Sequence, residues 1–410
     1  MASVAACRGR GAPPSSPAAA PAPPGKATAE SFYAQPFSRK PTVPAMTELG
    51  RKLFFDRSLS ASGQMSCATC HDPRFGYGPP NALSTQLGGP DLKSPGVRAV
   101  PSLRYLNTLP AFTEHTFDEA VDESVDQGPT GGHGWDGRAG AAHDQARLPL
   151  TSPFEMANPS IDSVVDKVAR GPSAAGFRET FGDDVFADPK RAATAVLLSI
   201  EVFEQSPKDF YPYSSRYDAW LRRKGELGPR EQRGLALFND PRKGNCASCH
   251  PSGIRDGAFP QFTDYGFQAV GVPRNRTLAA NDDPRFYDMG LCGPQRTDLA
   301  SHKEYCGAFR VPTLRNVAQR HVFFHNGVFH RLDQVLQFYV ERDTRPGKWF
   351  PRVNGRVDVF DDLPEAYRKN VNHEPPFGGK SGGAPALNRT EIGDLIAFLD
   401  TLTDADLARR

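Results

Sequence analysis

The sequence predicts a mainly α-helical protein made of two related units, and three observations support this fold class. One pattern of residues occurs twice, each copy is followed much later by a segment with helical spacing, and turn-forming residues are abundant. Gly and Pro each number 38 among 410 residues, which favours short helices joined by long loops. The length suffices for two or three domains of ordinary size.

The repeated pattern lies near the start of each unit. Residues 49–56 (LGRKLFFD) precede residues 65–71 (MSCATCH), and residues 233–240 (RGLALFND) precede residues 245–250 (NCASCH). Each copy predicts a short amphipathic helix with Leu and Phe on one face, then a turn and a Cys-x-x-Cys-His group. This similarity indicates a duplicated helical unit.

The two units also end alike. Residues 189–206 show helical spacing of apolar side chains, and residues 388–402 repeat that spacing. We therefore expect one domain at residues 31–215 and a second at residues 216–410. Residues 1–30 are rich in Pro, Ala and Ser, which predicts a disordered tether.

The tether carries one specific signal. Val4-Ala5-Ala6-Cys7 resembles the end of a bacterial lipoprotein signal, in which Cys7 would carry a lipid anchor. The apolar segment that precedes such a cysteine is missing, so a chance cysteine in an Ala-rich leader is the alternative. No run of about 18 apolar residues occurs, so no membrane-spanning helix is predicted. The net charge of +2 and a hydrophobic content of 38% argue against a disordered chain and a nucleic-acid-binding protein.

Seven cysteines divide into three groups. One is Cys7, and four belong to the Cys-x-x-Cys-His groups, which leaves Cys292 and Cys306. We interpret these two as a disulfide, with two buried thiols as the alternative, because spacing alone does not fix pairing. A disulfide fits an oxidising compartment such as the bacterial periplasm.

Cys-x-x-Cys-His is the attachment signature of c-type haem. A zinc site would need paired knuckles close in sequence, and a thioredoxin-like site would need a βαβ setting; neither pattern is present. We therefore expect two covalently bound haem c groups, with His71 and His250 as the proximal ligands of the irons. The cysteines that would bind the porphyrin vinyl groups are Cys67, Cys70, Cys246 and Cys249.

The ligand on the other face of each iron decides the function. A Met ligand gives an electron-transfer haem, whereas an open face lets peroxide bind. The chain has five Met residues, of which only Met289 follows His250. No His occurs between Asp72 and Ser102, so no nearby imidazole can close the first haem.

Further motifs, taken in order, resemble the bacterial di-haem cytochrome c peroxidase and MauG family across residues 45–405. The resemblance implies two cytochrome c-like helical domains, each with one covalent haem. The first haem would be peroxidatic and the second would transfer electrons. The motifs are residues 134–139 (GWDGRA), Gln145, residues 149–156 (PLTSPFEM), 311–316 (VPTLRN), 324–327 (FHNG) and 335–339 (VLQFY).

The resemblance also implies catalytic roles for single residues. Trp135 lies between the haems and couples them electronically, while Gln145 and Glu155 line the distal pocket of the first haem. Glu155 is the acid–base group there, because cleavage of the O–O bond requires a proton to move between the peroxide oxygens. Pro149 matches the pocket proline of the MauG branch.

At the second haem, Tyr339 falls where peroxidases have a Met ligand and where MauG has an axial tyrosine. The resemblance therefore makes Tyr339 the expected second ligand of this iron, with an ordinary core tyrosine as the alternative. His325 and Arg315 belong to the matching motifs and are expected to lie around the haems.

Family members often hold Ca²⁺ between the haems through an Asn side chain and two backbone oxygens. The Asn position is Ala99 in this chain, and the backbone oxygens would belong to Arg320 and Val322. The substitution argues against calcium.

These features imply an enzyme of the MauG branch. It would store two oxidising equivalents from hydrogen peroxide on its haems and oxidise a Trp or Tyr side chain of a periplasmic protein. The motifs around Cys292 and Cys306 resemble the MbnH subgroup, whose partner is a copper-binding protein of the MbnP type. One alternative is a cytochrome c peroxidase supplied with electrons by a small cytochrome or cupredoxin. Another is a di-haem electron carrier without catalysis.

Overall fold

The computed structural model of the chain describes residues 32–118 and 122–408, and it is mainly helical, as the sequence predicts. The expected tether and Cys7 lie outside the described residues. Residues 37–410 pack as one unit, so the expected domain boundary near residue 215 stays a prediction. Among the described residues, no helix is both long and apolar enough to cross a membrane.

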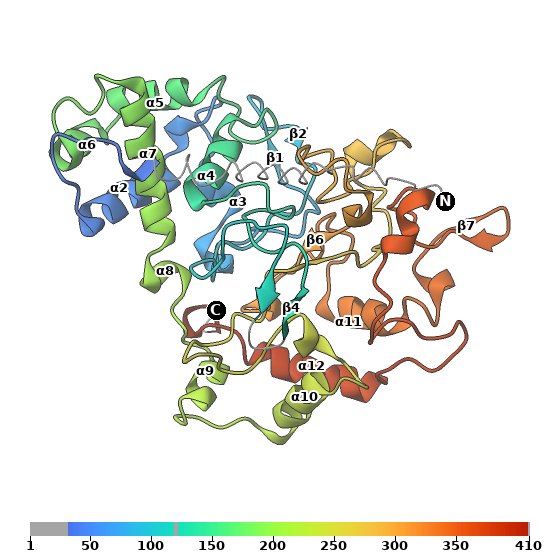
Figure 1. Cartoon of the computed structure of the whole chain (residues 1–410). Helices are drawn as coiled ribbons and strands as arrows, with labels where there is room; N and C mark the ends of the chain where they lie inside the picture. Colours follow the sequence, from blue (N-terminus) through green and yellow to red (C-terminus); the bar gives the residue numbers. More distant parts are fainter. Residues whose placement is uncertain (1–31, 119–121, 409–410) are drawn as a thin grey trace, which may run out of the picture. The chain divides into compact units, whose positions relative to one another are not determined.

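The helices are short and separated by long loops (Figure 1). The α-helices of the first half are α2 (Val43–Phe55), α3 (Cys67–Cys70), α4 (Ala142–Thr151), α5 (Ile161–Arg170), α6 (Ala174–Phe181), α7 (Pro189–Glu204) and α8 (Pro207–Phe210). Those of the second half are α9 (Arg216–Leu221), α10 (Pro229–Asn239), α11 (Leu332–Glu341), α12 (Arg389–Asp400) and α13 (Ala405–Ala408). Single 3₁₀ turns lie between them: η1 (Arg57–Leu59), η2 (Pro73–Phe75), η3 (Cys246–Ser248), η4 (Ala279–Asp282), η5 (Lys303–Tyr305), η6 (Val317–Gln319), η7 (Pro346–Lys348) and η8 (Glu365–Asn370).

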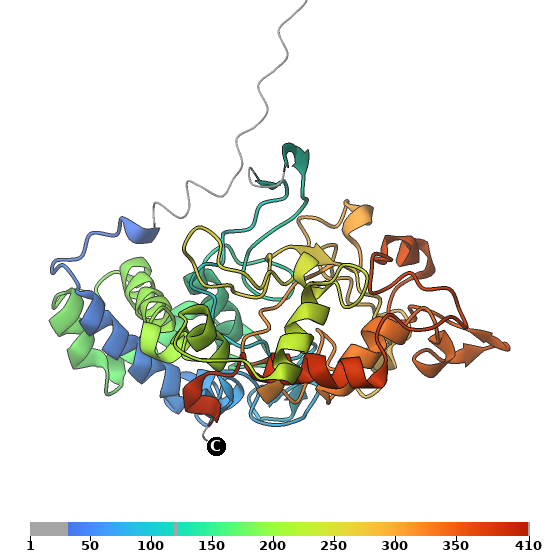
Figure 2. The ribbon, with the colours of Figure 1, turned by 90° about the horizontal axis from the view of Figure 1, so that it is seen from below.

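The described strands form only small antiparallel pairs, which the sequence does not predict. The β3–β4 pair stands out from the neighbouring helices in Figure 2. The pairs are β1 (Leu87–Gly88) with β2 (Ser94–Pro95), β3 (Phe117–Asp118) with β4 (Asp122–Asp126), β5 (Phe267–Gln268) with β6 (Phe309–Arg310), and β7 (Arg352–Val353) with β8 (Arg356–Val357).

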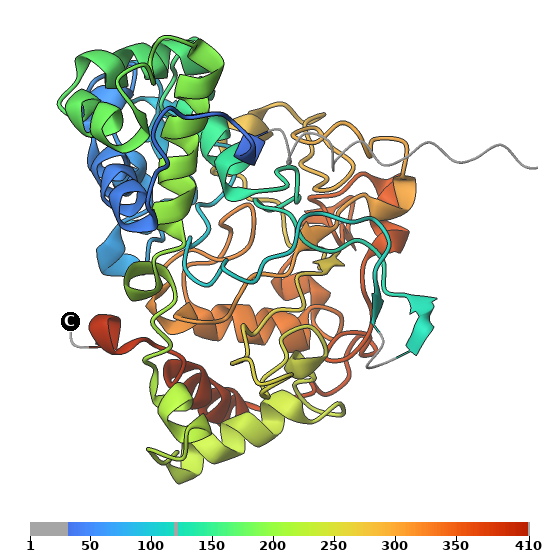
Figure 3. The ribbon, with the colours of Figure 1, turned by 60° about the vertical axis from the view of Figure 1, so that its left-hand side comes forward.

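Each copy of the repeat forms a helix that crosses a later helix at a glycine. Helix α2 packs against α7, and α10 packs against α12, as Figures 1 and 3 show. A Cβ on Gly50 would lie 1.9 Å from the Ser199 carbonyl oxygen, and one on Gly234 would lie 2.1 Å from that of Asp394. Only glycine lets two backbones approach so closely, so each repeated glycine sets the spacing of its helix pair.

One turn after each of these glycines, a phenylalanine fills the space beside the crossing. Phe54 meets Phe203 with ring centroids 5.4 Å apart, and Phe238 meets Phe398 at 5.2 Å. All four rings are buried, and burial of such a ring stabilises the fold by about 1.5–3 kcal/mol. The duplication in sequence therefore corresponds to a duplicated packing arrangement.

Polar side chains begin the closing helices. The carboxylate of Asp188 accepts a hydrogen bond from the Arg191 backbone N–H at 2.7 Å, and the Asn388 side chain accepts one from Glu391 at 3.0 Å. Such caps satisfy N–H groups that have no partner within the first helical turn. The sequence therefore places the starts of α7 and α12 correctly to within one residue.

Candidate active site

Both histidines of the Cys-x-x-Cys-His groups are held by a backbone carbonyl. The Nδ1 atom of His71 lies 3.1 Å from the Tyr77 oxygen, and that of His250 lies 2.7 Å from the Phe262 oxygen. An Nδ1–H that donates to a carbonyl leaves Nε2 free as a metal ligand. Burial lowers the pKa of both imidazoles to about 4, so both are neutral at pH 7, the form that binds a metal.

The surroundings of the second group fit a covalent haem. Cys246, Cys249 and His250 line one cavity together with Tyr339. None of the four cysteines of the two groups takes part in a disulfide. The rest of the wall is largely apolar, as a porphyrin ring requires, and includes Phe238, Val272, Leu336, Leu395 and Leu399.

At the first group, a carboxylate lies near the cysteines. The charge of Glu155 raises the pKa of the Cys67 and Cys70 thiols, after the larger effect of burial. Burial also raises the pKa of Glu155 itself. The structure therefore brings Glu155, which follows α4, to the haem-attachment group that follows α2.

A glycine holds the Glu155 segment in place. The Glu155 carbonyl accepts a hydrogen bond from the Gly89 N–H at 2.8 Å. A Cβ on Gly88 would lie only 2.9 Å from the Glu155 Cα. The short β1–β2 hairpin therefore packs directly against the backbone of the candidate acid–base residue.

Gln145 and Pro149 lie four residues apart on α4, so their side chains share one face of this helix. Pro149 stands inside the helix and has no N–H to donate to the Gln145 carbonyl. The Pro149 carbonyl accepts a hydrogen bond from Met156 at 3.0 Å. This bond folds the chain after α4 back towards the C-terminal end of that helix.

Trp135 lies between segments of the two halves. Its indole Nε1 donates to the Ala99 carbonyl at 2.7 Å, and its own carbonyl accepts from the Arg310 backbone N–H at 2.8 Å. Trp135 also lines the cavity of His250, together with Pro101 from the first half. The Pro101 carbonyl contacts His71, so a short path leads from His71 past Trp135 to the cavity of His250.

Tyr339 is on α11 and lies near both cysteines of the second group, whose charges raise its pKa after the larger effect of burial. Its ring stacks between Phe324 at 5.9 Å and Phe377 at 5.1 Å, with interplanar angles of 28° and 24°. These neighbours fix the direction of the phenol. Tyr339 lines the cavity of His250 and also packs against the apolar core, so both its role as a ligand and the alternative of a core tyrosine stay predictions.

His325 and Arg315 line the same cavity but have different partners. The His325 ring stacks on Phe309 with centroids 3.5 Å apart, and its Nε2 has no hydrogen-bond partner. Arg315 forms a buried two-point ion pair with Asp218, with both distances 3.0 Å. Arg315 therefore supports the wall of the cavity, while the His325 Nε2 lies 3.8 Å from a carboxylate oxygen of Asp362.

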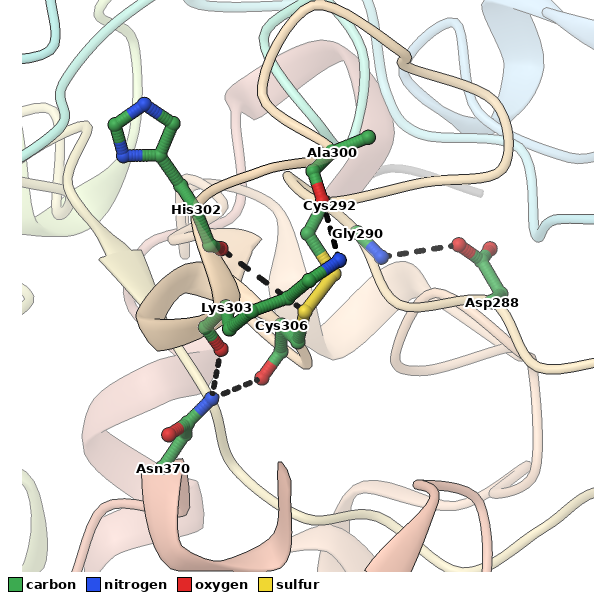
Figure 4. The surroundings of a disulfide bond; sticks show 8 residues. All are labelled: Asp288, Gly290, Cys292, Ala300, His302, Lys303, Cys306 and Asn370. Carbon is green, nitrogen blue, oxygen red and sulfur yellow. Dashed lines mark hydrogen bonds between the residues drawn. A yellow bond between two sulfur atoms is a disulfide. The ribbon is translucent and has the colours of Figure 1, made fainter. Parts of the chain in front are cut away.

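Cys292 and Cys306 form a disulfide (Figure 4). Asn370 donates to the carbonyls of Lys303 at 2.7 Å and Cys306 at 3.1 Å. The disulfide therefore closes part of the loop between β5 and β6, and the Asn370 hydrogen bonds join that loop to η8, which follows α11. Asp288 in the same loop accepts a hydrogen bond from the Gly290 N–H at 3.2 Å (Figure 4).

One ionisable group near the first cysteine pair is not among the site residues predicted from the sequence. Glu204 ends α7, and burial raises its pKa to about 8. Its charge raises the pKa of Cys67, after the effect of burial. One turn earlier, Glu201 binds His143 with 2.5 Å between the carboxylate oxygen and Nδ1. Two carboxylates on the apolar face of a predicted helix are the signal that could have revealed this cluster.

The residues at the expected calcium position do not fit a divalent cation. Ala99 offers no side-chain oxygen, and its carbonyl already accepts the indole N–H of Trp135. The Val322 carbonyl accepts from the Arg320 guanidinium at 3.3 Å, so a positive charge stands at this position.

The two Cys-x-x-Cys-His groups have unlike surroundings, with a carboxylate near one and a tyrosine near the other, and this arrangement fits the class of di-haem cytochromes. Comparisons with known proteins agree. Residues 44–226 match the family model of the di-haem cytochrome c peroxidases. The chain is 32% identical over 373 residues to the methylamine utilization protein MauG of Paracoccus denitrificans, across 89% of this chain and 90% of that protein.

Two further proteins are similar over most of the chain. The cytochrome c551 peroxidase of Nitrosomonas europaea is 28% identical over 360 residues, which covers 87% of this chain and 80% of that protein. The crystal structure of the diheme peroxidase BthA from Burkholderia thailandensis superposes with a TM-score of 0.79 at 39% identity, covering 92% and 89% of the two chains. The chain therefore belongs to the di-haem cytochrome c peroxidase and MauG family. It is a peroxide-dependent oxidoreductase, and its family implies haem c cofactors.

Proposed function

We propose that this enzyme is a MauG-like oxidase of the bacterial periplasm, which uses hydrogen peroxide to oxidise a Trp or Tyr side chain of a partner protein. The observation that carries the proposal is the position of Tyr339, which lines the cavity of Cys246, Cys249 and His250. With Tyr339 and His250 as ligands, the second haem could not bind peroxide. Peroxide would then react at the haem of His71, beside Glu155.

When bound, the haems supply the redox chemistry and accept two oxidising equivalents from peroxide. Glu155 takes a proton from the near oxygen of peroxide and delivers it to the far oxygen, which leaves as water. Gln145 and Pro149 shape the same pocket from α4. The transferred proton and the proton already on the far oxygen complete that water, so no other proton donor is needed for this step. The buried carboxyl of Glu204, whose pKa burial raises to about 8, lies near Cys67.

Trp135 provides the electronic connection between the two haem sites in this proposal. Its hydrogen bond to Ala99 and its place in the cavity wall hold the indole ring between the segments of His71 and His250. Tyr339 binds as a phenolate. Burial raises its pKa, so the ring ionises only against the charge of a metal, and the anionic oxygen then favours the oxidised states of the second haem.

The partner is the least constrained part of the proposal. The motifs around Cys292 and Cys306 support an MbnP-type copper-binding protein as the substrate, and Cys7 supports a lipid anchor. The similarity to a cytochrome c551 peroxidase favours one alternative, a peroxidase that draws electrons from a small cytochrome or cupredoxin. A di-haem carrier without catalysis would have two six-coordinate haems.

Electron paramagnetic resonance of the ferric protein tests the ligands directly. We expect one high-spin five-coordinate haem and one low-spin haem. Tyr339→Phe removes the phenolate oxygen and should change the low-spin signal while leaving the high-spin signal in place. Tyr367→Phe, a half-buried tyrosine of η8, is the matched control and should change neither. An unchanged low-spin signal in Tyr339→Phe would exclude this ligand.

A second measurement separates the oxidase from the peroxidase. With peroxide alone, the oxidase should change the mass of a copper-binding partner in proportion to the peroxide added. Sustained oxidation of reduced cytochrome without any mass change on the partner would instead identify the peroxidase. No reaction with peroxide at all would identify the carrier.

A further inference from the structure

Two arginines near Trp135 lack the carboxylate partner that other buried arginines of this chain have. Arg98, Arg104 and Arg315 each lie within hydrogen-bond distance of an Asp carboxylate, at 2.6, 2.9 and 3.0 Å. In the described part of the chain, the side-chain hydrogen bonds of Arg310 and Arg320 go only to backbone carbonyls.

These carbonyls connect both arginines to Trp135. Arg310 binds the Gly134 carbonyl through Nε at 3.0 Å, and its backbone N–H binds the Trp135 carbonyl at 2.8 Å. Arg320 binds the Val100 carbonyl at 3.1 Å, and the residue before Val100 accepts the indole N–H of Trp135. Arg310 therefore contacts Trp135 directly through its backbone. Arg320 binds Val100, the neighbour of Ala99, whose carbonyl accepts the Trp135 indole N–H.

Both guanidinium groups also line the cavity of His250. Each guanidinium has five N–H donors. Backbone carbonyls accept a hydrogen bond from one donor of Arg310 and from two donors of Arg320. The other donors are available to a group in the cavity. The charge of Arg320 also reaches His71, whose pKa it lowers after the effect of burial, so Arg320 is close to both haem sites.

A charge held away from water without a counter-charge destabilises a protein by several kcal/mol. Burial lowers the pKa of both arginines to about 10, which still leaves them cationic at pH 7. Asp136 offsets the charge of Arg310 only in part and from beyond hydrogen-bond distance, and among the described residues burial is the one influence on the pKa of Arg320. A bound anionic group would supply the remaining counter-charge. A haem carries two propionate carboxylates, and a guanidinium binds a carboxylate through two parallel hydrogen bonds.

We propose that Arg310 and Arg320 bind propionate carboxylates of the two haems and form a fixed pair of positive charges beside Trp135. Each carboxylate would supply the anion that the protein itself does not. The Arg320 guanidinium, which binds the Val322 carbonyl, would also supply the positive charge that a metal cation between the haems would otherwise supply. This inference depends on the presence of the haems but not on Tyr339 as a ligand or on the identity of the substrate.

The reduction potentials of the two haems test the proposal. Removing a nearby positive charge stabilises the oxidised haem, so Arg320→Gln should shift the oxidised-to-reduced equilibrium of at least one haem about tenfold towards the oxidised form. For a one-electron couple this equals about 59 mV. Arg320→Lys keeps the charge and should shift the equilibrium less than about threefold, or roughly 28 mV. Optical redox titration of the holoprotein measures both changes.

The control variant is Arg331→Gln, because Arg331 is exposed and paired with Asp333; it should leave both potentials unchanged. Equal shifts in Arg320→Gln and Arg320→Lys would show that the charge is not responsible and would overturn the proposal. So would unchanged potentials in an Arg320→Gln protein with both haems attached.

Two measurements remain decisive if Arg320→Gln does not fold. The first is the same comparison at Arg310, with Arg310→Gln and Arg310→Lys, where equal potentials in both variants would contradict the proposal. The second uses the wild-type holoprotein, whose potentials should not change when a calcium chelator or excess calcium is added. Potentials that depend on calcium would show that a metal, rather than Arg320, supplies the positive charge.

Discussion

Glu155 shows how burial prepares an ordinary carboxylate for proton transfer. Its pKa is raised by burial, and the charge of Arg138 opposes this shift only in part. The backbone of Glu155 is held by Gly89 from the β1–β2 hairpin. A base that is raised in pKa and fixed in position can accept a proton from peroxide and release it again within one reaction.

The pH dependence of the peroxide reaction should reveal this group. Glu155 must be ionised to act as a base, so the rate should fall as the pH drops through its pKa. Since burial raises that pKa above the ordinary value of 4.5, the fall should occur at a higher pH than for an exposed glutamate. Stopped-flow absorbance of the haems after peroxide addition measures the rate.

Glu155→Gln should slow the peroxide reaction by about 10²–10⁴-fold, the usual contribution of a positioned acid–base group. The fall of the rate at low pH, which we attribute to protonation of Glu155, should be absent in this variant. Glu226→Gln in the loop before α10 is a control that should keep the wild-type rate and profile. A Glu155→Gln enzyme that retained both would assign the proton transfer to another group.

At the scale of elements, the two glycine crossings explain why each Cys-x-x-Cys-His group follows a helix of this kind. The crossings of α2 with α7 and of α10 with α12 place Phe54 and Phe238 in matching positions. Phe54 packs on Tyr77, whose carbonyl holds His71, and Phe238 packs on Phe262, whose carbonyl holds His250. The phenylalanine of each helix therefore packs on the aromatic residue whose backbone carbonyl holds the histidine, so helix packing orients both His71 and His250.

Gly234→Ala should separate α10 from α12 and destabilise the protein by about 3 kcal/mol, because a methyl group 2.1 Å from a carbonyl oxygen cannot be accommodated without backbone movement. The same change should disturb the ligation of the second haem more than that of the first. Urea unfolding and the low-spin electron paramagnetic resonance signal measure these two effects.

The matched control is Gly253→Ala, since a Cβ there would meet no atom within 4 Å. It should change the free energy of unfolding by less than about 0.5 kcal/mol, as surface substitutions usually do. A Gly234→Ala protein as stable as this control would mean that the helix pair tolerates a wider spacing.

Across the whole molecule, a chain of polar contacts joins the disulfide loop to Trp135. Asp288, four residues before Cys292, binds Arg98 at 2.6 Å, and Arg98 binds Asp136 at 2.7 Å. Asp136 follows Trp135 directly, and the Ala99 carbonyl next to Arg98 accepts the Trp135 indole N–H. Parts of the chain about 190 residues apart thereby fix one tryptophan.

Replacing both cysteines, as Cys292→Ser with Cys306→Ser, should lower the free energy of unfolding by about 3 kcal/mol, the chain-entropy value for a loop of this length. Under reducing conditions the wild-type disulfide is itself broken, so the wild-type protein and the variant should then have equal free energies of unfolding. Calorimetry under oxidising and reducing conditions measures it. Equal stability in the oxidised state would show that the surrounding hydrogen bonds alone hold the loop.

The sequence alone determined the features that are local along the chain. Each Cys-x-x-Cys-His group lies within five residues, so its chemistry can be recognised without a fold. The repeat and the two closing helices follow from spacing, which the observed bounds of α7 and α12 match closely. The resemblance to a known family added Glu155 and Tyr339, since neither residue has a distinctive local pattern.

Only the tertiary structure decided which distant residues share a cavity and which charges are paired. Glu204 reaches Cys67 across the α2–α7 crossing, and Tyr339 reaches the cavity of His250 only because α11 packs beside α12. No sequence pattern separates Arg98 from Arg320, yet Arg98 is neutralised by two carboxylates, whereas the side chain of Arg320 binds only backbone carbonyls among the described residues. Electrostatic interactions and burial depend on distances in space, and the order of residues along a chain does not fix those distances before the helices pack.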